Sequence, residues 1–408
     1  MDAADMKDST DKDTSPAMPW GAVWILSVTQ IVSWGSLFYA FSVLLSPIEQ
    51  ETGWGRDTVV GAFSLSLLLA GAGALPAGML VDRFGGRKVM SLGSITAGVL
   101  LLGLARSESI LAFYAAWAGL GVAMSLLLYE PAFAVIYANF GGRARKAITA
   151  LTLIAGFAST VFWPLTQALV DAVGWRQTLT LMGLANLLVC VPLHLRLPAP
   201  RRAKPDRAAG SATAPRALLR HVLHTPSFWL LAVSFTANML AFSALSVHLI
   251  PLLRERGLSA SDAVLLAALI GPMQVLGRVL EFTVGVRFHA TQVGLLALLM
   301  LPAALIALIF AGSSWSLILW FVILYGASNG VMTIVRAITP AELFGRESYG
   351  AINGALSAPV IASRAAGPLA ASIVWSYAGG YQAVLWLLAG LGVVAVAGFG
   401  LAARGRKG

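Results

Sequence analysis

The chain has 408 residues, of which 58% are hydrophobic and only 11% are charged, and its formal net charge is +10. Soluble proteins carry about 25% charged residues, so this composition leaves too few charges to cover a water-exposed surface and indicates a protein with several membrane spans. Its single cysteine, Cys190, excludes a disulfide framework, a zinc site built from cysteines and an iron–sulfur cluster.

Apolar stretches long enough to cross a bilayer, which requires about 20 residues, occur twelve times along the chain. Clusters of charged and turn-forming residues separate them. We therefore predict an all-α membrane protein with twelve transmembrane helices. In chain order the predicted spans cover residues 20–45, 58–81, 88–106, 109–138, 146–170, 175–196, 226–251, 262–286, 289–311, 314–338, 349–375 and 380–403.

The longest polar interruption, residues 197–225, is rich in Arg, Pro and Ala and separates two halves of six spans each. The halves are related by an internal repeat with a constant offset, at which Glu51 is opposite Glu255 and Pro164 is opposite Pro368. Two copies of six spans have the same orientation, so we predict two parallel six-helix bundles. The predicted parts are a disordered tail (1–18), the N-terminal bundle (19–196), the linker (197–225), the C-terminal bundle (226–403) and a short tail (404–408).

The positive charges are distributed unevenly between the two sides of the predicted helices. Of the 28 Lys and Arg residues, 20 lie in the tails, the linker and the loops of that same side, and only five lie in the loops of the opposite side. Because cytoplasmic loops are enriched in Lys and Arg, we expect the linker and both tails in the cytoplasm and the chain in the cell membrane. Membrane topology thereby explains the net charge, and no nucleic-acid partner is expected. The five residues are Arg56, Arg106, Arg176, Arg254 and Arg256.

The loop between the second and third predicted spans carries a motif. Its sequence, Gly78-Met79-Leu80-Val81-Asp82-Arg83-Phe84-Gly85-Gly86-Arg87-Lys88, resembles the G-x-L-x-D-R-x-G-R-K loop of the major facilitator superfamily. The resemblance implies two bundles around a central cavity that opens alternately to either side of the membrane. It also implies a gating role for this loop; the alternative is a basic loop that serves topology alone. The gating residues would be Gly78, Asp82, Arg83, Gly86, Arg87 and Lys88, with a tight turn at Gly85-Gly86.

A second stretch is similar to the monocarboxylate and oxalate/formate porter branch of that superfamily. The similarity extends from Tyr129-Glu130-Pro131 in span 4, through Phe140, Arg143 and Pro164, to Gly174-Trp175-Arg176. It implies that the substrate is a small organic anion.

Two charged residues lie deep in span 8. A charge at the centre of a span costs about 2.5–3.5 kcal/mol on insertion scales, so each such residue is expected to have a structural partner or a function. Arg278 and Glu281 are three residues apart, on one helical face, where they can neutralise each other as a structural pair. The family resemblance implies instead that Arg278 binds the carboxylate of the substrate, for which a planar guanidinium is well suited.

A further arginine, Arg364, lies near the middle of span 11 between small residues that permit close helix packing. A second cation facing Arg278 resembles the paired charges of dicarboxylate exchangers, which implies a role in substrate binding. The alternatives are a charge partner for Glu281 or Glu130, or a side chain that extends to the membrane interface. We expect the aromatic side chains of Tyr39 and Tyr129 to line the same cavity.

Glu130 is the acid best placed for coupling. A buried carboxylate can carry a proton, so Glu130 is a candidate for proton coupling, and the alternative is a charge partner for Arg336, Arg364 or Arg143. Arg336 lies close to the cytoplasmic end of span 10, where we expect it to extend to the interface or to form a charge pair at the inner gate.

Together these features predict a secondary transporter for a small mono- or dicarboxylate, coupled to protons or to counter-anion exchange. The alternative is proton-driven efflux of hydrophobic or toxic compounds on the same fold. No G-x-x-x-x-G-K-[ST] run is present, so ATP-driven transport is not indicated. We expect no enzymatic activity, no metal and no cofactor, and we expect a monomer in the bilayer.

Overall fold

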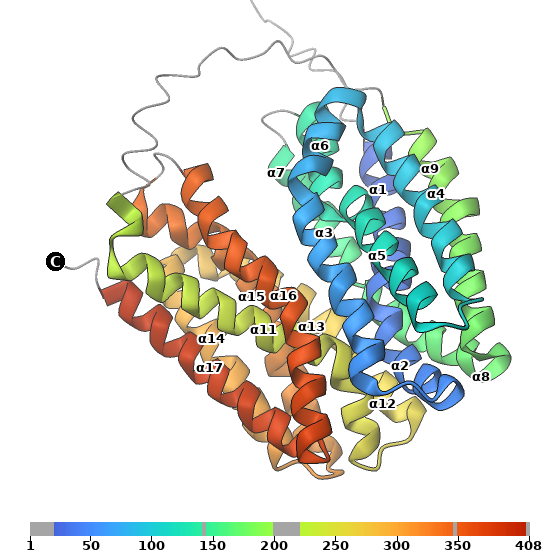
Figure 1. Ribbon diagram of the computed structural model, residues 1–408. Coiled ribbons are helices and arrows are strands. Elements are labelled where there is room, and N and C mark those ends of the chain that lie inside the picture. The colour runs from blue at the N-terminus through green and yellow to red at the C-terminus, as the bar shows by residue number, and fades with distance from the viewer. Residues whose placement is uncertain (1–19, 141–143, 199–220, 346–348, 405–408) are drawn as a thin grey trace, which may run out of the picture.

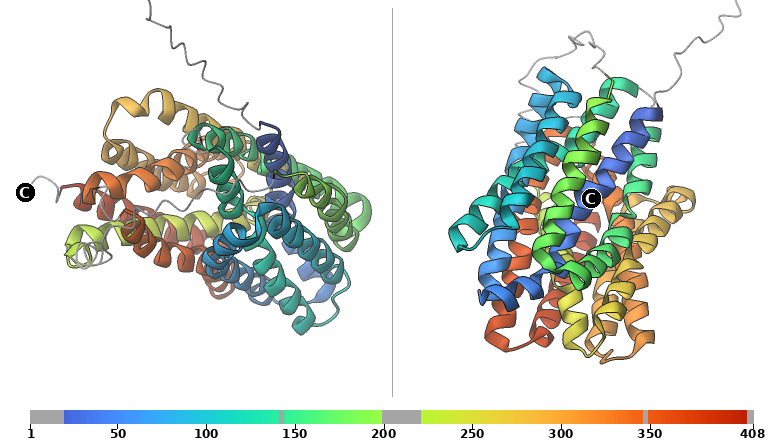
Figure 2. Two further views of the ribbon diagram at one scale, coloured as in Figure 1. Left: turned by 90° about the horizontal axis from the view of Figure 1, so that it is seen from above. Right: turned by 90° about the vertical axis from the view of Figure 1, so that its right-hand side faces the viewer.

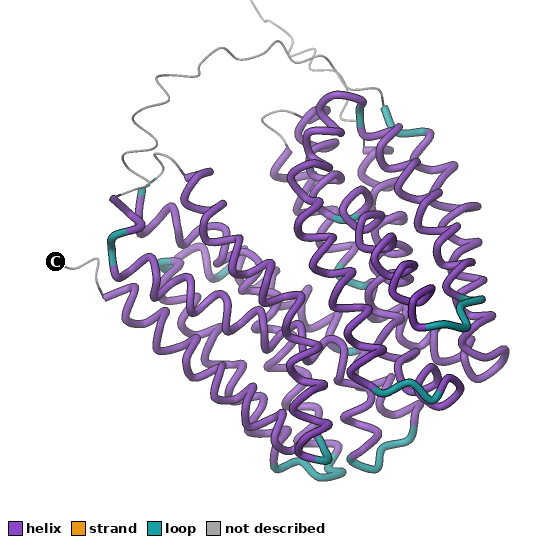
Figure 3. Tube along the Cα trace, viewed as in Figure 1, coloured by secondary structure: helices purple, strands orange, loops and turns teal. Residues whose placement is uncertain are grey.

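The computed structural model describes residues 20–140, 144–198, 221–345 and 349–404, and the regular structure within these ranges is helical throughout (Figure 3). The predicted tail 1–18, most of the linker and residues 405–408 lie outside the described residues. The N-terminal half contains α1 (Trp20–Trp34), η1 (Gly35–Tyr39), α2 (Ala40–Thr52), α3 (Arg56–Phe84), α4 (Gly86–Leu104), α5 (Ile110–Leu127), α6 (Tyr129–Phe140), α7 (Ala144–Ala155), α8 (Ala158–Ala185), η3 (Asn186–Cys190) and α9 (Val191–Leu195). The C-terminal half contains α11 (Pro226–Glu255), α12 (Ala260–Ala268), α13 (Ile270–Thr283), η4 (Gly285–Arg287), α14 (Ala290–Ile309), α15 (Trp315–Phe344), α16 (Tyr349–Ala378) and α17 (Tyr381–Arg404).

The number of membrane crossings agrees with the prediction. Ten helical segments in the described ranges are long and apolar enough to cross a membrane. One of them, Ala144–Leu195, has 52 residues and breaks at Gly174, whose φ is +78°, so it accounts for two crossings. The 30-residue helix α16 provides the remaining one. The predicted all-α fold with twelve transmembrane helices is therefore confirmed.

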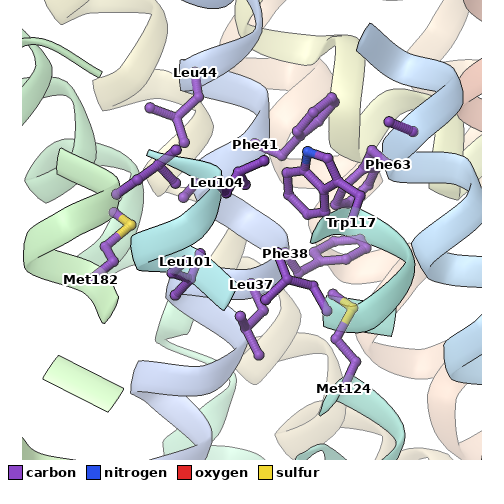
Figure 4. Packing of buried hydrophobic residues seen from close by; sticks show 14 of the residues in the cluster. Leu37, Phe38, Phe41, Leu44, Phe63, Leu101, Leu104, Trp117, Met124 and Met182 are labelled. Atoms are coloured by element: carbon purple, nitrogen blue, oxygen red, sulfur yellow. The ribbon is translucent and has the colours of Figure 1, made fainter. Parts of the chain in front are cut away.

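The helices form two bundles that lie beside each other, α1–α9 in one and α11–α17 in the other (Figures 1 and 2). The core of the N-terminal bundle contains stacked Phe41 and Phe63 rings, 4.2 Å apart, and both rings meet Trp117 edge-on (Figure 4). Lipid is as apolar as these side chains, so close packing is what holds such helices together. Gly121 of α5 accordingly lies so close to the backbone of Ser66 in α3 that no Cβ would fit.

The two bundles contact each other at the end opposite to the linker. Asp57, at the start of α3, accepts hydrogen bonds from the hydroxyl groups of Ser372 (2.5 Å) and Ser376 (3.1 Å) of α16. Beside it, Arg56 Nη1 donates to the Tyr381 hydroxyl (3.1 Å). These five residues, which we call the distal contact, join the N-terminal bundle to the C-terminal bundle at this end.

Candidate functional site

A cavity of ≈ 180 Å³ lies between the two bundles, and its two walls differ in chemistry. The N-terminal bundle contributes an aromatic wall, made of Trp34, Phe38, Tyr39 and Tyr129. The C-terminal bundle contributes Phe235, Phe242 and two methionines, and in addition all of the cations and side-chain amides, which are Arg278, Arg336, Arg364, Asn238, Gln274 and Asn329. Within the described residues, none that lines this cavity is acidic. The cavity is therefore suited to an anion that also has an apolar part.

The aromatic wall depends on a π-helical turn in span 1. In η1 the turn is one residue wider than in an α-helix, and the hydrogen bond to Gly35 O comes from the fifth residue after it. Gly35 faces the Phe162 ring of α8 so closely that a Cβ would overlap it. The wider turn brings Trp34, Phe38 and Tyr39 together on the cavity side, with ring centroids 5.2–6.4 Å apart.

Arg278 lines the cavity from α13 and reaches across to the other bundle. Its Nη1 donates to the backbone carbonyl of Thr152 in α7 (2.7 Å), and its guanidinium interacts with the Tyr129 hydroxyl. The neighbouring Gly277 packs directly on the backbone of Ala327 in α15, with no room for a Cβ. Arg278 Nε is buried and has no hydrogen-bond partner among the described residues.

The alternative of a structural Arg278–Glu281 pair is not observed. No ion pair joins these two described residues; Glu281 does not line the cavity and has Arg145 of α7 as its charged neighbour. A pair of this spacing on a helix gains only about 0.2–0.5 kcal/mol, whereas a hydrogen bond from a cation contributes about 1.5–3 kcal/mol. The bond to Thr152 therefore determines the direction of the Arg278 side chain.

Arg364 lies over the aromatic wall. Its guanidinium carbon is 5.2 Å from the centre of the Trp34 ring and 5.6 Å from that of Phe38. Arg364 also lines a second, smaller cavity of ≈ 60 Å³ between α3, α5 and α16, and Glu130 lines the same space. Glu130 and Arg364 interact electrostatically across it, although they do not form an ion pair within 4 Å.

Glu130 is exposed, which corrects the prediction of a buried carboxylate. Span 4 breaks at Leu128, whose ψ is −155°, and α6 begins at Tyr129, so Glu130 lies in the first turn of a new helix. An acid in that position stabilises the helix N-terminus, and here it also faces the second cavity. Of its three predicted partners, Arg364 is an electrostatic neighbour, and Arg143 lies outside the described residues.

Arg336 lines the main cavity, where its side chain is exposed. The sequence predicts that it extends to the interface or forms a charge pair at the inner gate. The structure brings it into one space with Arg278 and Arg364, and Tyr39 and Tyr129 line that space as well.

The loop between α3 and α4 makes the predicted tight turn, but its two glycines serve different purposes. Gly85 has a φ of +82° and donates from its N–H to Val81 O (2.8 Å), which ends α3. Gly86 packs against Val135 of α6 with no room for a Cβ. Arg87 Nε donates to the carbonyl of Leu197 (2.9 Å) and so connects the loop to the start of the linker. The other residues of the motif are placed as follows: Gly78 lies within α3, and Asp82, Arg83 and Lys88 are exposed.

Sequence reasoning missed the amides of the C-terminal wall. Asn238, Gln274 and Asn329 each lie within an apolar span and line the cavity. Polar side chains inside spans are rare and face the interior of a bundle, so their presence alone was a usable signal.

Comparisons with known proteins agree with this architecture. The family model of the Major Facilitator Superfamily matches residues 24–286. The chain is 27% identical over 276 residues to monocarboxylate transporter 4 of Rattus norvegicus, which covers 65% of this chain and 57% of that protein. It is 24% identical over 251 residues to the oxalate:formate antiporter of Oxalobacter formigenes, covering 58% and 56%. Among solved structures, the nucleoside transporter NupG superposes with a TM-score of 0.79 at 14% identity, covering 93% of this chain and 98% of that one.

Proposed function

Because the chain belongs to the Major Facilitator Superfamily, we propose that it is a secondary transporter that moves a small mono- or dicarboxylate through the cavity between its bundles. The observation that carries the proposal is that Arg278 and Arg364, which both lie in helices long enough to span a membrane, line one cavity together with an aromatic wall. Two cations within membrane spans are costly, and planar guanidinium groups bind carboxylates through two parallel hydrogen bonds. The names of two relatives, a monocarboxylate transporter and an oxalate:formate antiporter, support the same substrate class.

In this proposal the substrate binds the two arginines, and its apolar part lies against Tyr39 and Tyr129. Arg336 adds a third positive charge to the cavity, which favours entry of an anion. Alternating access then requires the distal contact to open while the linker side closes around the loop from Gly78 to Lys88. The cell membrane is the proposed location, with the linker side in the cytoplasm, in accord with the distribution of Lys and Arg.

Glu130 is the proposed coupling residue. Its carboxylate and a substrate carboxylate both interact with the positive charge of Arg364, from the two cavities that this arginine lines. Binding of the substrate at Arg364 therefore competes with the interaction between Arg364 and Glu130, and this competition links anion binding to the acid. Glu281 lies near Arg145 and outside the cavity, so we propose that it acts as a structural charge partner.

Uptake into proteoliposomes tests the proposal. Labelled lactate, formate and oxalate are offered with and without a pH gradient, and with and without unlabelled anion inside. Arg364→Ala should abolish uptake, whereas Arg106→Ala, which changes an exposed arginine that bonds only to its own helix, should not. Transport of none of these anions, together with extrusion of hydrophobic dyes, would favour the efflux function instead.

A further inference from the structure

Gln30 of α1 is a buried amide that neither lines the cavity nor belongs to the predicted site. Its side chain is completely buried, and both ends of the amide are used. Nε2 donates to the backbone carbonyl of Leu127 (2.6 Å), and Oε1 accepts from the indole N–H of Trp34 (3.1 Å). The amide therefore bridges the break in span 4 to one ring of the aromatic wall.

The Leu127 carbonyl is available for a reason that can be read in the sequence. In a continuous helix it would accept from the N–H of the residue at position 131, but that residue is Pro131, which has no N–H. The neighbouring Leu128 is extended rather than helical, so α5 ends there and α6 starts anew. A buried carbonyl without a donor is costly, and the Gln30 amide provides the missing hydrogen bond.

The other end of the bridge sets the orientation of Trp34. Trp34 is only 9% exposed, and its ring meets Tyr129 at 5.2 Å. The Arg364 guanidinium lies over this ring, 5.2 Å from its centre, and both residues line the cavity. Trp is the aromatic residue that attracts a cation most strongly, and the attraction depends on the cation lying over the ring face. Rotation of the indole would thus change the position of the guanidinium.

We propose that Gln30 is a positioning residue that holds Arg364 in place through the indole of Trp34. The consequence for transport rests on the proposed function, in which Arg364 binds the substrate carboxylate. The geometric claim is independent of it, because it concerns only the guanidinium and the ring beneath it. Three contacts connect the two ends of this arrangement. Pro131 leaves the Leu127 carbonyl without a helical donor, the Gln30 amide bonds both to that carbonyl and to the Trp34 indole, and the Trp34 ring lies beneath Arg364.

A measurement without substrate tests the geometric claim. Purified full-length protein is treated with phenylglyoxal, which reacts with guanidinium groups, and modification of Arg364 is followed by mass spectrometry relative to Arg106. Gln30→Leu removes both hydrogen bonds and should change the modification rate of Arg364 by about three- to tenfold, since each net hydrogen bond corresponds to a factor in that range. An unchanged rate in a Gln30→Leu protein that elutes and melts like the wild type would overturn the proposal.

A double-mutant cycle separates positioning from general stability. Trp34→Phe keeps an aromatic ring but removes the indole N–H, so adding Gln30→Leu to it should alter the Arg364 rate little further. Equal effects of Gln30→Leu in both backgrounds would show that the amide acts only on Leu127, and the proposal would be withdrawn. Where Gln30→Leu does not fold, Gln30→Met serves instead, because methionine has nearly the length and volume of glutamine but makes neither hydrogen bond. An unchanged Arg364 rate then counts equally against the proposal.

Transport measurements distinguish failure of this proposal from failure of the proposed function. For labelled lactate or oxalate, Gln30→Leu should raise KM by a similar factor and change kcat less. If the wild type moves neither anion, the proposed function fails while the labelling result still decides the role of Gln30. If the wild type transports and Gln30→Leu leaves both KM and the Arg364 rate unaltered, the positioning role alone fails.

Discussion

Asp57→Asn should release the distal contact and shift the transporter towards the state that is open at that end. Asp57 accepts hydrogen bonds from two hydroxyl groups of the opposite bundle, Ser372 at 2.5 Å and Ser376 at 3.1 Å. Hydrogen bonds to a charged group contribute about 1.5–3 kcal/mol each, but Ser376 is exposed and an asparagine can still accept through its carbonyl oxygen. We therefore expect a loss of about 1–2 kcal/mol, which corresponds to about 5–30-fold in the ratio of closed to open molecules.

The shift can be measured by electron–electron resonance between spin labels placed on either bundle at this end. Glu108→Cys and Ser313→Cys provide exposed positions, in a Cys190→Ala background. Asp57→Asn should increase the population at longer distance. The matched control is Asp171→Asn, because Asp171 accepts from Gln167 of its own helix and does not join the bundles. Identical distance distributions for Asp57→Asn and wild type, or the same change in the control, would refute the assignment of the distal contact as a gate.

Three further predictions concern the cavity and the loop between α3 and α4. Arg278→Lys should reduce uptake of carboxylates by about tenfold or more, because lysine keeps the charge but loses the parallel donors; unchanged apparent affinity in a folded variant would rule out a carboxylate clamp. Glu130→Gln should weaken uptake driven by a pH gradient and leave counterflow exchange intact, whereas equal loss of both activities would assign the acid to charge balance. Gly85→Ala should lower the free energy of unfolding by about 1–3 kcal/mol, because its φ of +82° is strained for any other residue. Gly78→Ala, which meets nothing within 4 Å, is the control, and equal melting temperatures for the two variants would contradict this argument.

The helices were predictable because the bilayer acts on each segment separately. A span must be about 20 residues long and must satisfy its own backbone hydrogen bonds, so length and hydropathy suffice to find it. The continuous helical segment Ala144–Leu195 contains two of the predicted spans, and Gly174 marks the turn between spans 5 and 6. The cavity arginines were recognised for a related reason, because a charge that cannot face lipid must face the protein interior.

The direction of individual side chains was not predictable in this way. Spacing along α13 favoured an Arg278–Glu281 pair, but it contains no information about the Thr152 carbonyl that approaches from the other bundle. The apolar surroundings of Glu130 in the sequence suggested burial, whereas the break at Leu128 turns this residue out into the second cavity.

The sequence by itself thus determined the membrane location, the twelve crossings, the repeat of two halves and the charges that need a protein environment. Only the tertiary structure decided which groups meet around those charges. The Gln30–Leu127 bond joins residues 97 positions apart, and it exists because a proline breaks one helix at the point where another helix presents an amide. Such contacts depend on how helices rotate, break and pack against each other, and hydropathy, which is a property of single segments, does not encode that geometry.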